Sequence, residues 1–203
     1  MAAPLEEMIN GKGGKIFVRS WRPASAPRGV VAICHGFNAH SGHYAWAADQ
    51  LVAKGLAVYA LDLRGRGKSE GERFYADSIG DYLSDLTALI DRAKTREPGL
   101  PIFLLGHSAG GVVSVTWALE NPGKLAGLVC ESFAYKVPAP APALAVLKFL
   151  AQFARHAKAV APKNEDFSRD TAHVQRLNAD PLIKGEKQPL ATMSALIRAN
   201  SRL

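Results

Sequence analysis

The first 130 residues alternate between short apolar runs and helical segments, and this alternation restricts the fold more than any other feature. Strands are predicted at residues 15–21, 29–34, 57–63, 102–105 and 125–130. Strands that are apolar throughout are typical of a parallel sheet with helices on both faces. The sequence therefore predicts an α/β fold with a mostly parallel sheet, whose ligands bind at the carboxyl ends of the strands.

Helices are predicted between these strands at residues 44–54, 79–93 and 109–120. The second has the clearest pattern, because its apolar residues recur every three or four positions and so lie on one face. Ser78, followed three residues later by Asp81, predicts a capping box at its start. The spacing thus favours helices that each bury one face against the sheet.

The alternation stops after Ser132, which divides the chain into a predicted core (1–132) and a predicted cap or lid (133–203). The cap is expected to contain helices and loops but no further sheet. A helix is predicted at 144–160, with a narrow polar stripe of Lys148, Gln152 and Arg155. Its many apolar positions predict either contact with lipid, with Lys148 and Arg155 at anionic head groups, or packing of this helix on the domain.

The pentapeptide 106–110, Gly-His-Ser-Ala-Gly, lies between a predicted strand and a predicted helix. This G-x-S-x-G pattern in a strand–turn–helix context is the nucleophile elbow, in which Ser108 sits on a sharp turn at positive φ. Small residues let the strand and helix approach, and Gly106, Gly110 and Gly111 provide them. Ser108 is therefore the predicted catalytic nucleophile.

An elbow of this kind needs an oxyanion hole, for which two backbone N–H donors are predicted. One is the N–H of Ala109, directly after the serine, and the other is the N–H of Phe37, in the loop after an earlier strand. His35 is expected to order that loop. His107 is expected to pack beside the elbow, with its side chain pointing away from Ser108.

Composition argues against several other functions. The net charge of +7 is spread along the chain, with no stretch of five or six like charges, so nucleic-acid binding is not expected. Gly67-Lys68-Ser69 resembles the end of a phosphate-binding loop, but Asp62 stands where that motif needs its first glycine. Both cysteines, Cys34 and Cys130, are expected to be buried free thiols.

Neither a metal nor an organic cofactor is expected. His40 and His43 are three residues apart, but no acidic or thiol companion lies near them in the sequence. The N-terminus lacks the apolar segment of a secretory signal, and no run of eighteen apolar residues occurs. The expected location is the cytoplasm, with peripheral membrane contact through the cap.

Three stretches resemble the signature blocks of the monoacylglycerol lipase and lysophospholipase family, also called serine aminopeptidase-like hydrolases. They are HGFNAHSGHY at 35–44, DLRGRGKSEG at 62–71 and GHSAGG at 106–111, with a weaker match at 167–170 and 178–182. The resemblance extends from about residue 14 onward. It implies an α/β-hydrolase that cleaves lipid esters such as monoacylglycerols or lysophospholipids through an acyl-enzyme. It also implies that Asp62 forms a loop and is not the catalytic acid.

In this fold the acid and the histidine of the triad follow the serine in that order. In the family the acid follows a further strand, whereas residues 195–203 are predicted to form the last cap helix. The triad acid and base, with the last strands and helices, are therefore expected beyond residue 203, and residues 1–203 alone are expected to be inactive. Asp170 with His173 is a disfavoured substitute. A non-catalytic binding module or remnant is the alternative function.

Overall fold

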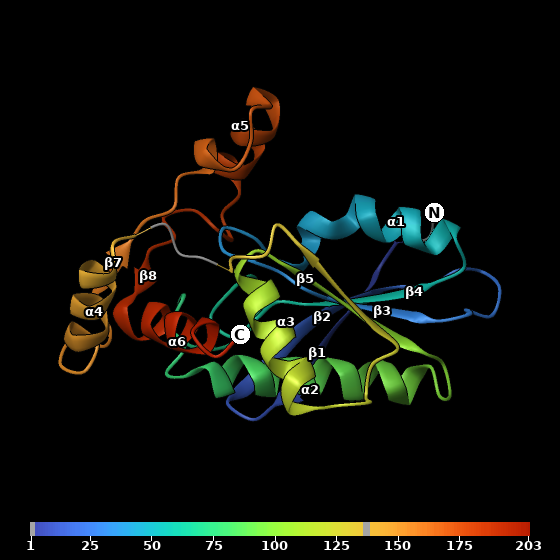
Figure 1. Ribbon diagram of the computed structural model, residues 1–203. Coiled ribbons are helices and arrows are strands. Elements are labelled where there is room, and N and C mark those ends of the chain that lie inside the picture. Colours follow the sequence, from blue (N-terminus) through green and yellow to red (C-terminus); the bar gives the residue numbers. More distant parts are fainter. Residues whose placement is uncertain (1–2, 136–138) are drawn as a thin grey trace.

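The computed structural model describes residues 3–135 and 139–203, and its centre is a six-stranded mixed sheet (Figure 1). The strands run in the spatial order β1-β2-β4-β3-β5-β6. Neighbours β4, β3, β5 and β6 are parallel, while β2 is antiparallel to both β1 and β4. The strands are β1 (Leu5–Gly11), β2 (Gly14–Trp21), β3 (Val30–Cys34), β4 (Ala57–Leu61), β5 (Ile102–His107) and β6 (Gly127–Glu131). The predicted mostly parallel sheet is confirmed.

Strand β1 was not expected from the sequence, because its exposed, acid-rich segment lacks a continuous apolar run. It forms a hairpin with β2 in full register from Leu5–Ser20 to Gly11–Gly14. Gly14 closes the turn at φ 131°, a conformation that glycine adopts without a steric penalty. The glycines at 11, 13 and 14 were thus the available signal for a hairpin turn.

Helices cover both faces of the sheet. Alternate residues of a strand therefore belong to two separate hydrophobic cores, one on each face. Val30, Ala32 and Cys34 of β3 pack toward α2 (Ile79–Arg96) and α3 (Ala109–Glu120). Val31 and Ile33 face the opposite side, where α1 (Ala45–Ala53) follows the short 3-10 helix η1 (Ser41–Tyr44). The period of two along a strand therefore explains why its whole sequence is apolar.

The predicted cap segment contains helices, but it also contains a small sheet. Its elements are α4 (Ala141–Leu150), β7 (Lys158–Val160), η2 (Asn164–Asp166), α5 (Thr171–Ala179), β8 (Gln188–Pro189) and α6 (Leu190–Asn200). Strands β7 and β8 pair antiparallel, so the expectation of no further sheet is wrong. Figure 1 shows α5 standing away from the core while α6 lies beside α3.

The helix predicted at 144–160 is shorter than expected, since α4 ends at Leu150. The backbone carbonyls of Arg155 and Ala157 instead accept hydrogen bonds from the first amides of α6, at Ala191 (3.0 Å) and Leu190 (2.8 Å). Tertiary hydrogen bonds have replaced the helical ones. The Arg155 side chain, expected at lipid head groups, pairs with Asp77 of the core (Nη2–Oδ1 2.5 Å).

Strand β6 lies at the edge of the sheet, and none of the described residues pairs with its outer side. Its side chains are exposed, with Leu128 at 37% and Val129 at 53%. Cys130, expected to be buried, is exposed, whereas Cys34 is buried as expected. An apolar edge with free backbone groups is a template for pairing with another chain.

We predict that Val129→Lys will raise the monomer fraction of residues 1–203, because a lysine on an edge strand opposes pairing between chains. The measurement is size exclusion with light scattering over a range of concentrations. Leu5→Lys is the matched control, since it adds the same charge to β1, at the opposite edge, which already carries Glu6 and Glu7. A wild-type chain that stays monomeric at every concentration would contradict the prediction.

Candidate active site

Ser108 lies on a tight turn between β5, which ends at His107, and α3, which begins at Ala109. Its backbone has φ 52° and ψ −119°, so the predicted positive φ is observed. Three hydrogen bonds hold the turn: the Ser108 N–H donates to the Glu131 carbonyl (3.0 Å), and the Ser108 carbonyl accepts from the N–H groups of Gly111 (2.9 Å) and Ala134 (3.3 Å). Such strain is typical of functional sites and persists only where the surroundings enforce it.

Glycines allow the backbone of this turn to approach its neighbours closely. A Cβ at Gly36 would lie 2.8 Å from Ser108 Cβ and 3.3 Å from Ser108 Oγ. A Cβ at Gly110 would collide with the backbone carbonyl oxygens of Cys34 and His35, at the end of β3. The expected close approach of strand and helix is therefore observed, and it places the loop after β3 directly against Ser108.

We predict that Gly110→Ala will lower the free energy of unfolding by about 1–3 kcal/mol, the usual effect of overpacking a rigid site. Gly80→Ala is the control, because its added Cβ would meet only Ser78 Oγ, at 3.4 Å, and alanine favours helices. Urea unfolding followed by circular dichroism measures both. Equal stability of Gly110→Ala and the wild type would show that the contact can relax.

The two predicted oxyanion donors, Phe37 and Ala109, lie in the segments that meet at Ser108. Within residues 3–135 and 139–203, neither backbone N–H donates a hydrogen bond to a protein acceptor. Both residues also line one small pocket, together with Gly36 and Leu63. The Ala109 N–H is one of the free donors that begin a helix, where the positive end of the helix dipole favours an anion.

His35 and Asp62 tie together the loops around this site. The buried His35 ring donates from Nδ1 to the Gly36 carbonyl (2.7 Å) and accepts the Leu63 N–H at Nε2 (3.1 Å). Burial lowers the pKa of His35 to about 4, so the ring is neutral at pH 7. The buried Asp62 carboxylate accepts the N–H groups of Ser41 (2.7 Å) and Lys68 (2.8 Å). The contacts agree with the loop-ordering roles expected for both residues.

His107, next to Ser108, directs its ring elsewhere, as expected. Its Nδ1 is 3.0 Å from the Tyr44 hydroxyl, and its Nε2 is 3.1 Å from the Glu131 carboxylate. Burial raises the pKa of Tyr44, which keeps its hydroxyl protonated and able to donate to Nδ1. No hydrogen bond joins Ser108 Oγ to a histidine anywhere in the described part of the chain.

Asp170, the disfavoured acid of the pair Asp170–His173, has another contact, and so does the further histidine of the cap, His156. The Asp170 carboxylate caps α5 by accepting the N–H groups of Ala172 (2.9 Å) and His173 (3.1 Å). His156 pairs with Glu72 (Nδ1–Oε1 2.9 Å) and stacks on Tyr75. The observed contacts give these residues capping and surface roles.

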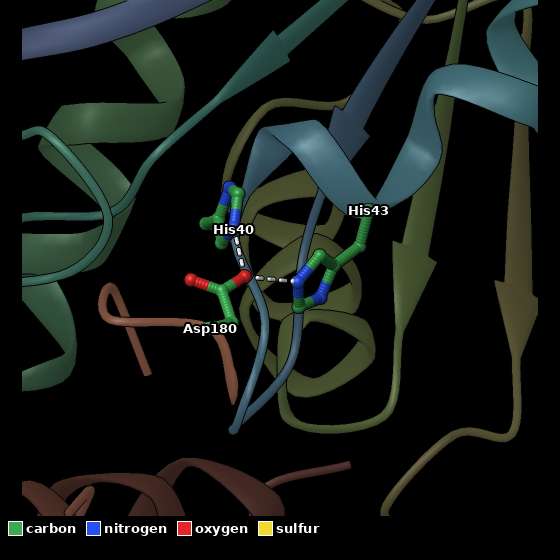
Figure 2. Close-up of side chains that lie close together, drawn as sticks. All are labelled: His40, His43 and Asp180. Carbon is green, nitrogen blue, oxygen red and sulfur yellow. Dashed lines mark hydrogen bonds and ion pairs between the residues drawn. The ribbon is translucent and has the colours of Figure 1, made fainter. Parts of the chain in front are cut away.

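His40 and His43 do have an acidic companion, contrary to expectation. Figure 2 shows Asp180, at the end of α5, between the two rings, with Oδ2 2.9 Å from His40 Nε2 and 2.8 Å from His43 Nε2. Because Asp180 follows the histidines by 137 residues or more, no local spacing could reveal it. The cluster brings together three groups of the kind that bind metals.

The hydrogen bonds at His40 identify its tautomer and favour an ion-free cluster. Its Nδ1 accepts the Gly42 N–H (3.0 Å), so the ring proton lies on Nε2 and points at Asp180. A metal at Nε2 would require that nitrogen to carry a free lone pair. The cluster is therefore suited to joining the cap to the core by hydrogen bonds.

Comparison with known proteins assigns the family. Residues 25–203 match the family described as serine aminopeptidase, S33. The chain belongs to this family. It is 30% identical to the monkeypox virus monoglyceride lipase homolog over 97% of the chain and 71% of that protein. It is 34% identical to the monoacylglycerol lipase of Mycolicibacterium smegmatis (95% and 70%) and 38% identical to human monoglyceride lipase (63% and 42%).

Solved structures confirm the α/β-hydrolase fold. A soluble variant of Saccharomyces cerevisiae monoglyceride lipase, in complex with a substrate analog, superposes with a TM-score of 0.84 at 20% identity, over 100% of this chain and 69% of that one. The Paleococcus ferrophilus monoacylglycerol lipase gives a TM-score of 0.80 at 27% identity, over 92% and 70%. The chain thus spans about 70% of each of these two structures.

Proposed function

We propose that the protein is a serine hydrolase that cleaves carboxylic esters of lipids, such as monoacylglycerols or lysophospholipids, through an acyl-enzyme. One observation carries this proposal: Ser108 occupies a strained elbow beside two backbone N–H groups, of Phe37 and Ala109, that donate to no described acceptor. Its relatives named monoglyceride or monoacylglycerol lipase support the substrate class.

In the proposed reaction Ser108 Oγ attacks the ester carbonyl carbon while its proton passes to a histidine base. The carbonyl oxygen becomes an oxyanion and accepts hydrogen bonds from the Phe37 and Ala109 N–H groups. One such donor typically contributes about 2.7–4 kcal/mol at the transition state. The histidine then protonates the departing alcohol, and water, deprotonated by the same histidine, releases the carboxylic acid and restores the serine.

The base and its acid are proposed to lie outside residues 1–203, in the order Ser, acid, His. In support, no described histidine bonds to Ser108, and the chain spans only part of each lipase that it matches. A serine without a base is a weak nucleophile, so residues 1–203 are proposed to be inactive alone. Within this scheme 1–132 supplies the nucleophile and oxyanion donors, and 133–203 forms the cap.

We predict that Ser108→Ala will abolish hydrolysis of a short nitrophenyl ester by the protein with its complete family domain, because no other residue takes over the nucleophile's role. A chelator should leave the wild-type rate unchanged. Ser201→Ala, at an exposed position, is the control and should keep full activity. Retention of more than about a tenth of the rate by Ser108→Ala would reject the assignment, whereas no hydrolysis by the wild type would favour a binding module that retains the pocket.

The cap is proposed to contact lipid through α4 and the turn after it. Phe149 is 58% exposed and Phe153 76% exposed, and their rings pack together with centroids 5.2 Å apart. Val146 and Leu150 extend this apolar surface. None of the helices in the described residues is long and apolar enough to cross a bilayer. The contact proposed is therefore one with the surface of a lipid layer.

We predict that Phe149→Glu combined with Phe153→Glu will reduce flotation with anionic phospholipid vesicles, because it places two charges on the apolar surface of the cap. Trp46→Glu is the matched control, since Trp46 is a large side chain exposed to 76% on α1, outside the cap. Flotation that falls equally in both proteins, or in neither, would remove the cap from lipid binding.

A further inference from the structure

The loop after β3, residues 36–43, carries the Phe37 N–H and is held at two points by the core. At its start the carbonyl of Gly36 accepts from His35, and farther along the N–H of Ser41 donates to Asp62 (2.7 Å). Between these points the side chains of Asn38 and His40 form their hydrogen bonds with residues of the cap. The cap therefore contacts the part of the loop that directly follows Phe37.

Asn38 forms the first contact. It has φ 48°, an uncommon conformation for a residue other than glycine, and it adjoins Phe37 in the chain. Its carboxamide Nδ2 donates to Asn164 Oδ1 (2.8 Å) and to the Pro162 carbonyl (3.2 Å). Asn164 is itself held by Asn178 Oδ1 (2.8 Å), in α5. Asn164 of η2, itself held by α5, thus fixes a residue of the loop that has an uncommon backbone conformation.

Asp180 forms the second contact, with both histidines of the loop (Figure 2). Its other oxygen, Oδ1, accepts the Leu182 N–H (2.8 Å), so the carboxylate has a fixed orientation. Burial opposes ionisation, but hydrogen bonds from His43 and His40 outweigh it and lower the pKa of Asp180 to about 2. At neutral pH an ionised carboxylate of the cap therefore holds the end of the loop.

A third contact reaches Phe37 itself. The guanidinium of Arg66 lies 4.8 Å from the centre of the Phe37 ring, within the range of a cation–π interaction. Arg66 is buried, and its donors are bound by Glu186 and by Gln188 (2.7 Å), both in the cap. The first two contacts thus run directly from the cap to the segment 37–43, and the third runs from the cap through Arg66 of the core.

We propose that Asp180 is a positioning residue for the oxyanion hole: acting through His40 and His43, it sets the place of the Phe37 N–H relative to Ser108. The inference rests on the oxyanion role proposed for Phe37. Gly36 fits against Ser108 with no room for a Cβ, so a displaced loop moves the donor relative to the nucleophile. Small misplacements of catalytic groups have large effects on rate.

The first test uses residues 1–203 and needs no activity. Hydrogen–deuterium exchange is compared among the wild type, Asp180→Ala and Asp170→Ala. Asp170 caps the other end of the same helix, α5, without touching the loop, so it controls for loosening of the cap. We expect faster exchange in Asp180→Ala alone at residues 41–43, whose N–H groups donate to Asp62 and to His40. Equal exchange in both variants, or no change in either, would overturn the proposal.

The second test uses the protein with its complete family domain and a short nitrophenyl ester. Asp180→Ala should lower kcat about tenfold with KM changed less than twofold, because the donor acts mainly in the transition state. Asp180→Asn keeps an acceptor oxygen and should recover part of kcat. A kcat that falls equally in Asp170→Ala, or a larger effect on KM, would overturn the proposal.

The two tests separate this inference from the function on which it rests. If Ser108→Ala kept its activity, the proposed function would fail, while the exchange result would still show whether Asp180 holds the loop. If Asp180→Ala failed to fold, as judged by circular dichroism, Asp180→Asn would take its place in both measurements. A folded Asp180→Asn with wild-type exchange and wild-type kcat would then count against the proposal.

Discussion

The close approach of α3 to the end of β3 is the constraint on which the site depends. Gly110 lies against the carbonyls of Cys34 and His35, where no Cβ could be placed. This approach forces a turn too tight for an ordinary backbone, so Ser108 adopts a positive φ. The cost of that strain, on the order of 1–3 kcal/mol, persists because buried strands on both sides enforce it. The strained conformation of Ser108 is thus a consequence of the packing beneath it.

The loops at the carboxyl ends of β3 and β4 leave the sheet. Buried polar side chains supply hydrogen bonds that the backbone of these loops needs. Backbone groups that leave a sheet still need partners when they are buried. Asp62 binds two amides, and His35 joins the loop after β3 to the loop after β4. Because His35 is neutral, it can accept one amide while donating to a carbonyl. Both residues therefore organise the backbone that would hold an oxyanion.

The sequence predicts the parts of this structure that local patterns determine. The continuous apolar run of β3, the apolar face of α2 and the small residues around Ser108 are each patterns within a few residues, so each was recognisable. The end of α4, the pairing of β7 with β8 and the contact of Asp180 with the histidines depend on partners more than 25 residues away. No local spacing of residues in the sequence indicates partners this far apart. The exposed Cys130 was also misjudged, because an apolar run indicates a strand but not its place in the sheet.

The boundary proposed at residue 132 does not separate two folding units. Helix α6 follows that boundary, yet Leu196 and Ala199 belong to the core formed by α2 and α3. Thr192 of α6 also accepts the Ala76 N–H (2.8 Å), deep in the core. Because the cap shares this core, it is held in place when Asn164, Asp180 and Glu186 form their contacts. A cap that was flexibly hinged could not position a loop in this way, whereas one that is packed into the core can.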